Sequence, residues 1–161
     1  MNQTLSILLT VTIFISCSLQ YNTNVEELVT EYYKIYDERQ DFESFINFYD
    51  ENVVFEDVIN GDKITGKEAL THFFDWKNPD FIKVSENNLV VLDRIIQGNK
   101  AVIKGYFTEF RWDKMEVEAM HFTTILIFND SQKIIRQVDW INYPASLVDY
   151  NNRKNSNDWI E

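Results

Sequence analysis

The sequence predicts an α+β fold, in which three N-terminal helices pack against a strongly curved, mainly antiparallel sheet. Apolar residues recur at helical spacing before Asn78-Pro79, and four long runs rich in β-branched and aromatic residues follow it. The chain has 161 residues, 45% of them hydrophobic, and no repeat or Pro/Gly-rich linker divides it, so we expect one domain. A sheet that curves over a helix in this way can leave a pocket between them.

Capping signals set the expected helix boundaries. A capping box at Asn24 and Glu27 predicts a first helix to about Arg39, and Asp41 can cap a second helix. A second capping box, at residues 65–68, predicts a third. The apolar positions expected on the second and third helices are Phe42, Phe45, Ile46 and Tyr49, and Leu70, Phe73 and Phe74.

The strands follow from alternation and turn signals. One strand is expected over residues 52–58, ahead of the Asn60-Gly61 turn. Four more form a meander, over residues 84–97, 100–112, 117–129 and 133–143. Pro144 suits the start of a short final helix through Tyr150, and residues 151–161 are expected to be a polar tail.

Charge and cysteine content exclude several function classes. The net charge of −11 and a pI near 4.6 disfavour nucleic acid and electrostatic membrane binding. Residues 26–57 alone carry eleven acids against Lys34 and Arg39, which predicts a solvated acidic helical face. One Cys and two His, without a metal-binding motif, lead us to expect no metal and no cofactor.

The first 20 residues are expected to be a signal peptide. Residues 5–17 form an apolar run of the length of a signal-peptide core, too short for an ordinary membrane span. Its end, Phe14-Ile15-Ser16-Cys17, resembles a bacterial lipobox, in which Cys17 would carry the lipid. We rank a membrane-anchored lipoprotein first, a secreted or periplasmic soluble form second and an uncleaved anchor third. In each case we expect the domain over residues 21–150 to be exported. Where the protein contacts the membrane, we expect it to do so only through the N-terminal anchor.

Several segments in order resemble one superfamily. They are the aromatic first helix, the segment Asp41 to Tyr49, the strand end Phe55-Glu56-Asp57, the start of the third helix at residues 65–68, and residues 128–134 followed by Val138-Asp139-Trp140. Together they are similar to the nuclear transport factor 2-like superfamily, which includes the SnoaL-like and ketosteroid-isomerase-like proteins. The resemblance implies a cone-shaped fold with an apolar pocket, often dimeric through the sheet, in enzymes and in non-catalytic binding proteins alike.

The resemblance also implies candidate catalytic residues. Asp57 falls where ketosteroid isomerases have their general base, and Tyr33 falls on their oxyanion-hole tyrosine. Thr124 stands where those enzymes have a protonated Asp as second donor, which argues against steroid isomerisation. Asp139 lies where the limonene-epoxide-hydrolase branch has a catalytic Asp. Alternatively, Asp57 caps the following turn, Asp139 pairs with Arg111 or Lys104, and Tyr33 is a core aromatic.

Strand alternation around Thr124 predicts which residues line the pocket. Side chains of a strand alternate between the two faces of the sheet, and the family alignment extends the inward face to the last strand. The expected lining residues are Met120, Phe122, Thr124, Leu126, Phe128, Gln137 and Ile141.

Three functions remain open. The first is an exported domain that binds a small, largely apolar molecule in its cone. The second is an isomerase, lyase or epoxide-hydrolase-type enzyme that uses Asp57 with Tyr33 or Asp139. The third is a homodimerising module with a vestigial pocket. A homodimer is expected in any case.

Overall fold

The structure is a computed structural model that describes residues 24–148, 151 and 154–160. The predicted signal peptide and Cys17 lie outside these residues. Residues 24–38 are helical, so Asn24 already belongs to the first helix and is not the cap that the sequence predicted. No helix within the described ranges is long and apolar enough to cross a membrane.

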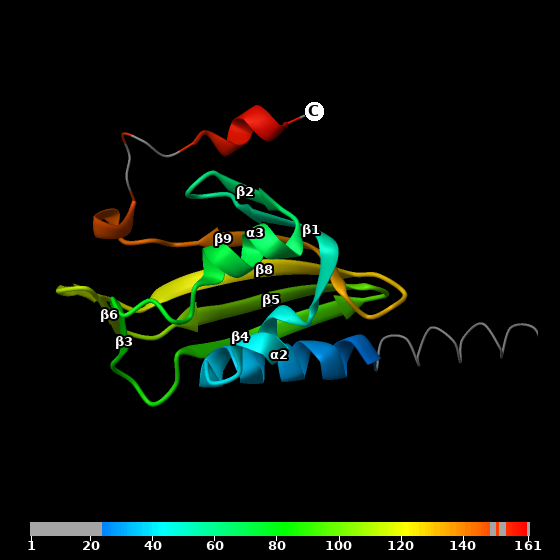
Figure 1. Cartoon of the computed structure of the whole chain (residues 1–161), viewed down its shortest axis with the longest axis horizontal. Helices are drawn as coiled ribbons and strands as arrows, with labels where there is room; N and C mark the ends of the chain where they lie inside the picture. The colour runs from blue at the N-terminus through cyan, green and yellow to red at the C-terminus, as the bar shows by residue number, and fades with distance from the viewer. Residues whose placement is uncertain (1–23, 149–150, 152–153, 161) are drawn as a thin grey trace, which may run out of the picture.

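The described elements confirm the predicted α+β class, with helices packed against a curved, mainly antiparallel sheet (Figure 1). The elements after the N-terminal helix are α2 (Phe42–Ile46), β1 (Tyr49–Asp57), β2 (Asp62–Thr65), α3 (Lys67–Phe74), β3 (Phe81–Lys83), β4 (Leu89–Gln97), β5 (Lys100–Phe107), β6 (Phe110–Trp112), β7 (Met115–Val117), β8 (Met120–Phe128), β9 (Ile134–Ile141), and the 3₁₀ turns η1 (Ala145–Leu147) and η2 (Ser156–Trp159).

The main sheet has the strand order β2-β1-β9-β8-β5-β4. All neighbours are antiparallel except β1 and β9, which run parallel and join the first strand of the chain to the last. A second, three-stranded sheet, β3-β6-β7, lies at one end of the main sheet (Figure 1).

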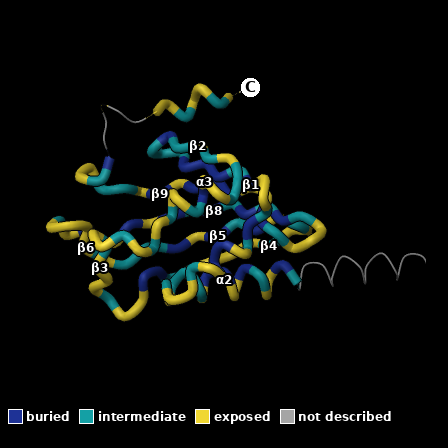
Figure 2. The backbone as a smooth tube through the Cα atoms, in the orientation of Figure 1, coloured by how far each residue is buried: buried dark blue, intermediate teal, exposed yellow. Residues whose placement is uncertain are grey.

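The inner face of the main sheet and the helices enclose one core (Figure 2). Burial alternates along β8, where every second residue from Met120 to Phe128 is buried. The first helix presents Tyr32 and Tyr33 to this face, and Tyr33 stacks on Phe122 with ring centroids 6.0 Å apart. Aromatic rings therefore fill much of the interior of the cone.

Several boundaries differ from the sequence expectations. Helix α2 begins as predicted, with the Asp41 side chain accepting a hydrogen bond from the Ser44 amide, but it ends at Ile46. The capping box predicted at Thr65 is wrong. Thr65 ends β2, and Gly66, at φ 91°, is the N-cap of α3 without a side-chain bond. That positive φ suits a residue without a Cβ.

The long second run of the expected meander breaks at Thr108, between β5 and β6. Its amide and hydroxyl donate to the carbonyls of Asn88 and Asn87, which leads the chain away from the main sheet and into the small one. Where a final helix was expected after Pro144, the described residues form the turn η1.

Part of the polar C-terminal segment is described by the structure. Residues 154–160 lie beside the edge strand β2 (Figure 1), and the Lys63 Nζ lies 5.5 Å from the centre of the Trp159 ring.

Candidate functional site

Three of the predicted site residues lie in one row across the main sheet. Asp57 of β1 pairs in register with Asp139 of β9, which pairs with Thr124 of β8. All three are buried, with exposed fractions of 1%, 6% and 4%. The register therefore places the two carboxylates in neighbouring strands.

Asp139 accepts hydrogen bonds on both carboxylate oxygens. Thr124 Oγ1 donates to Oδ1 at 2.6 Å, and Gln137 Nε2 donates to Oδ2 at 2.9 Å. Burial raises the pKa of Asp139 to about 7; these two hydrogen bonds oppose the rise, and the charge of Asp57 adds to it. The expected pairing of Asp139 with Arg111 or Lys104 is absent from the ion pairs of the described residues. Asp139 can therefore exchange a proton near neutral pH.

Asp57 caps the turn that follows it and also binds a tyrosine. Its Oδ1 accepts from the amides of Ile59 and Asn60, both at 3.0 Å, and its Oδ2 accepts from the Tyr143 hydroxyl at 2.6 Å. Burial and the charge of Asp57 raise the pKa of Tyr143 far above its ordinary value. Asp57 thus has three hydrogen-bond donors, two from the backbone and one from a side chain.

Tyr33 is a buried core aromatic close to Asp139. Burial first, and then the charge of Asp139, raise the pKa of its hydroxyl well above the usual value, while a contact with Thr124 opposes the rise. Tyr33 stays protonated and can act only as a hydrogen-bond donor or acceptor. The three candidates, Asp57, Asp139 and Tyr33, therefore lie in one region of the interior.

Further hydrogen bonds connect this row to two buried tyrosines. The Tyr32 and Tyr49 hydroxyls lie 2.7 Å apart, and Tyr49 donates to Gln137 Oε1 at 2.7 Å. Gln137 in turn donates to Asp139, so five buried side chains, Thr124 included, form a continuous network. A fully paired network of this kind fixes the position of each member.

A cavity of about 470 Å³ opens at the wide end of the cone. Its walls come from the first helix, α3, the small sheet and the ends of β5, β8 and β9. They are mainly apolar, and the lining residues are Tyr36, Arg39, Asn60, Phe73, Phe81, Asn88, Leu89, Phe107, Thr108, Phe110, Trp112, Met120, Ile141, Tyr143 and Leu147. The size and the apolar lining are those of a small-molecule site.

Two of the expected lining residues, Met120 and Ile141, line this cavity. The other five, Phe122, Thr124, Leu126, Phe128 and Gln137, are buried in the interior instead. Neither Asp57 nor Asp139 lines the cavity, although Tyr143, which does, binds Asp57 directly.

Tyr143 and Arg39 are among the polar cavity residues that sequence reasoning missed, as are Asn88 and Thr108. Tyr143 continues the inward alternation of Asp139 and Ile141, so one further step of the same pattern could have found it. Arg39 follows the last residue of the first helix with φ at 50°. Glycine is the usual residue in that left-handed position, and a side chain there costs roughly 1 kcal/mol or more. No sequence signal indicated that conformation.

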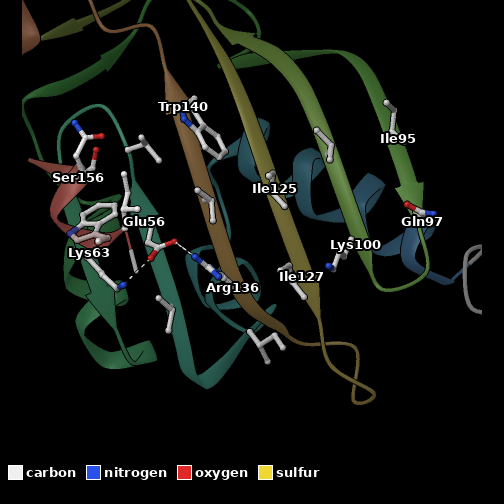
Figure 3. Close-up of a pocket in the computed structure, with 18 residues that line it drawn as sticks. Glu56, Lys63, Ile95, Gln97, Lys100, Ile125, Ile127, Arg136, Trp140 and Ser156 are labelled. Atoms are coloured by element: carbon white, nitrogen blue, oxygen red, sulfur yellow. Dashed lines mark hydrogen bonds and ion pairs between the residues drawn. The ribbon is translucent and has the colours of Figure 1, made fainter.

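A larger hollow, of about 1120 Å³, lies on the opposite face of the main sheet (Figure 3). Outward side chains such as Ile125 and Trp140 line it, and Glu56 there pairs with Lys63 at 3.0 Å and Arg136 at 2.7 Å. The sheet separates this hollow from the buried carboxylates. No group of three or more potential metal ligands occurs among the described residues.

Comparison with known proteins identifies the family. Residues 29–137 match the SnoaL-like domain. The chain belongs to the SnoaL-like domain family. No curated protein matches the chain. The SnoaL-like fold expected from the first helix and the Asp41–Tyr49 segment is thereby confirmed.

Solved structures show the same fold at low sequence identity. An NTF-2 like protein of unknown function from Burkholderia xenovorans LB400 has a TM-score of 0.60 and 13% identity, with 88% of this chain and 96% of that chain covered. A candidate SnoaL-like polyketide cyclase from Shewanella putrefaciens CN-32 has a TM-score of 0.61 and 19% identity, with 74% of this chain and 90% of that chain covered. An LEH-like epoxide hydrolase from M. tuberculosis has a TM-score of 0.61 and 12% identity, with 75% of this chain and 84% of that chain covered. The relatives thus include different chemistries on one fold.

Proposed function

We propose that this SnoaL-like domain binds a small, largely apolar molecule in the cavity at the wide end of the cone. The observation that carries the proposal is the cavity itself: aromatic and aliphatic side chains from the helices and from both sheets converge on about 470 Å³ of space. Burying the apolar surface of a ligand there would stabilise the complex by about 25 cal/mol for each Å² removed from water. A few polar groups, among them Asn60, Asn88 and Thr108, can orient the ligand.

The geometry favours binding over catalysis at this cavity. Both carboxylates lie beneath its lining, and Asp57 has three hydrogen-bond donors already in place. A general base must reach the proton that it removes, directly or through one water. Ligand contact with Asp57 or Asp139 would require Tyr143 or its neighbours to move.

The test compares a variant that fills the cavity with one that changes the opposite face of the same strand. Met120→Trp places an indole in the cavity, whereas Ile125→Trp places it in the outer hollow. Binding of 1-naphthylmethanol, measured by isothermal titration calorimetry, is expected in the wild type and Ile125→Trp and lost in Met120→Trp. Native mass spectrometry of the purified protein adds a search for a retained ligand. No binding in the wild type and no retained ligand would refute the proposal.

One observation supports an enzyme as the second candidate. Asp139 has a pKa of about 7 and lies beside Asp57 and Tyr33, an arrangement suited to general acid/base chemistry. Such an enzyme would be a cofactor-independent isomerase, lyase or epoxide hydrolase. A screen of enones, β-hydroxy ketones and epoxides should then show turnover that Asp57→Asn and Asp139→Asn abolish. Turnover unchanged in both variants would remove these residues from the mechanism.

Export with lipidation at Cys17 is a separate proposal, supported by the apolar run and the lipobox-like sequence at its end. Cells fed a palmitate analogue should label the wild-type protein but not Cys17→Ser. An unlabelled wild type found in the soluble exported fraction would favour plain secretion instead.

Homodimerisation through the outer face of the sheet is also proposed. Its support is apolar surface on that face, where Ile95 is 66% exposed and Trp140 40%. Sedimentation analysis should give a dimer for the wild type and a monomer for Thr123→Lys, whose side chain belongs to the same face. A monomeric wild type would rule the dimer out.

A further inference from the structure

Arg39 is a positively charged group in an otherwise uncharged cavity wall. The other lining residues described above are apolar, aromatic, amide or hydroxyl side chains. Burial lowers the pKa of Arg39 from its ordinary value, but the group stays cationic at neutral pH. The cavity therefore presents a single full positive charge to whatever enters it.

Aromatic faces hold the guanidinium in place. Its central carbon lies 4.2 Å from the centre of the Phe81 ring and 5.1 Å from the ring of Trp76. Stacking on ring faces leaves the N–H groups at the edge of the guanidinium plane available to an acceptor. The left-handed backbone at Arg39 is the local conformation from which the side chain reaches these rings.

No acid neutralises this charge among the residues that the structure describes. Arg94 and Arg136 pair with Glu26 and Glu56, but Arg39 is in none of the described ion pairs. Asp37, two residues before it in the first helix, accepts from the amides of Asn88 and Leu89. Arg39 is thus a cation without an acidic partner, although the chain has a net charge of −11 and its first helices are rich in acids. An anion from outside the chain can pair with it.

We infer that the ligand of this cavity is an apolar molecule with a single carboxylate, which pairs with the Arg39 guanidinium. The inference rests on the proposed function and specifies the class of its ligand. A planar carboxylate matches the guanidinium edge with two parallel hydrogen bonds. A phosphate monoester, with a charge of about −1.5 to −2, would be left partly unneutralised by one arginine.

The buried carboxylates favour one orientation of such a ligand. Tyr143 lines the cavity and is bonded to Asp57, so the floor near Tyr143 lies next to negative charge. A carboxylate placed there would be repelled, whereas an apolar ring would not. The carboxylate is therefore at the Arg39 side, with the apolar body directed towards Met120, Ile141 and Tyr143.

The test uses a matched pair of ligands and a matched pair of variants. 1-Naphthylacetate and 1-naphthylacetamide have the same shape and differ by one charge. Arg39→Gln and Arg94→Gln each remove one positive charge, but Arg94 pairs with Glu26 on the surface and is not part of this cavity. Dissociation constants come from isothermal titration calorimetry at fixed ionic strength, and thermal unfolding confirms that each variant is folded.

The wild type should bind the acid about tenfold more tightly than the amide, or more, since a charge-assisted hydrogen bond contributes at least that factor. Arg39→Gln should abolish this preference and leave the amide affinity unchanged, while Arg94→Gln should keep both. Equal affinity of the wild type for the two ligands would overturn the inference but not the proposed function. This comparison needs no variant. Failure of both ligands to bind would overturn the inference and, for aromatic ligands, the proposed function too.

Discussion

Replacing Asp139 by Asn should remove a large part of the pH dependence of folding stability. In the folded protein the pKa of Asp139 is about 7, against an ordinary value of 3.8. Between these values the folded state holds a proton that the unfolded state has lost. Stability therefore falls as pH rises towards 7, and the contribution of the neutral carboxyl is fully lost above that pH.

The magnitude follows from the two pKa values. Each unit of difference corresponds to about 1.4 kcal/mol, so ionising Asp139 in the folded state costs about 4 kcal/mol in total. Measurements from pH 5 to pH 8 stay above the sequence pI of about 4.6, where an acidic protein stays soluble. About 3 kcal/mol of the loss lies in that interval.

Urea denaturation at several pH values measures this effect. The free energy of unfolding of the wild type, less that of Asp139→Asn, should fall by about 3 kcal/mol between pH 5 and pH 8. Asp130→Asn, in an exposed turn, is the control and should keep the wild-type profile. Parallel profiles for the wild type and Asp139→Asn would refute the claim that burial holds this carboxyl protonated.

Two further variants test the same network and the C-terminal segment. Thr124→Val removes the hydrogen bond that most opposes the rise in the pKa of Asp139, so the loss of stability in the same urea series should move to higher pH; an unchanged midpoint would contradict this role of Thr124. Gly61→Ala should destabilise the fold by clearly more than Gly98→Ala. Both have positive φ and share a cost of roughly 1 kcal/mol, but a Cβ on Gly61 would overlap the backbone of Lys154, whereas a Cβ on Gly98 would meet none of the described non-neighbouring atoms within 4 Å. Equal unfolding midpoints would show that the backbone of Lys154 does not pack against Gly61.

Local patterns in the sequence predicted much of the fold. Alternation along β8 separated buried from exposed residues, and the polar side chain of Asp41 marked the start of α2. Both depend on residues adjacent along the chain. Thr65 failed as a cap because it pairs with Val54 across β1 and β2, a contact between segments that a capping pattern does not contain.

The site was harder to predict because its shape depends on packing. The sequence placed Phe122 and Leu126 on the inner face, but it could not show that aromatic rings from the helices fill the space beside them. The open space lies nearer the end of the cone, between the small sheet and the first helix. Arg39 reaches it only because the chain turns through a left-handed conformation at that residue.

The parallel pairing of β1 with β9 has a consequence for synthesis of the protein. β1 leaves the ribosome early, yet it joins the rest of the sheet only through β9, which is among the last strands made. Pairings between such distant segments form slowly, so β1 and β2 have no place in the main sheet until β9 has been made.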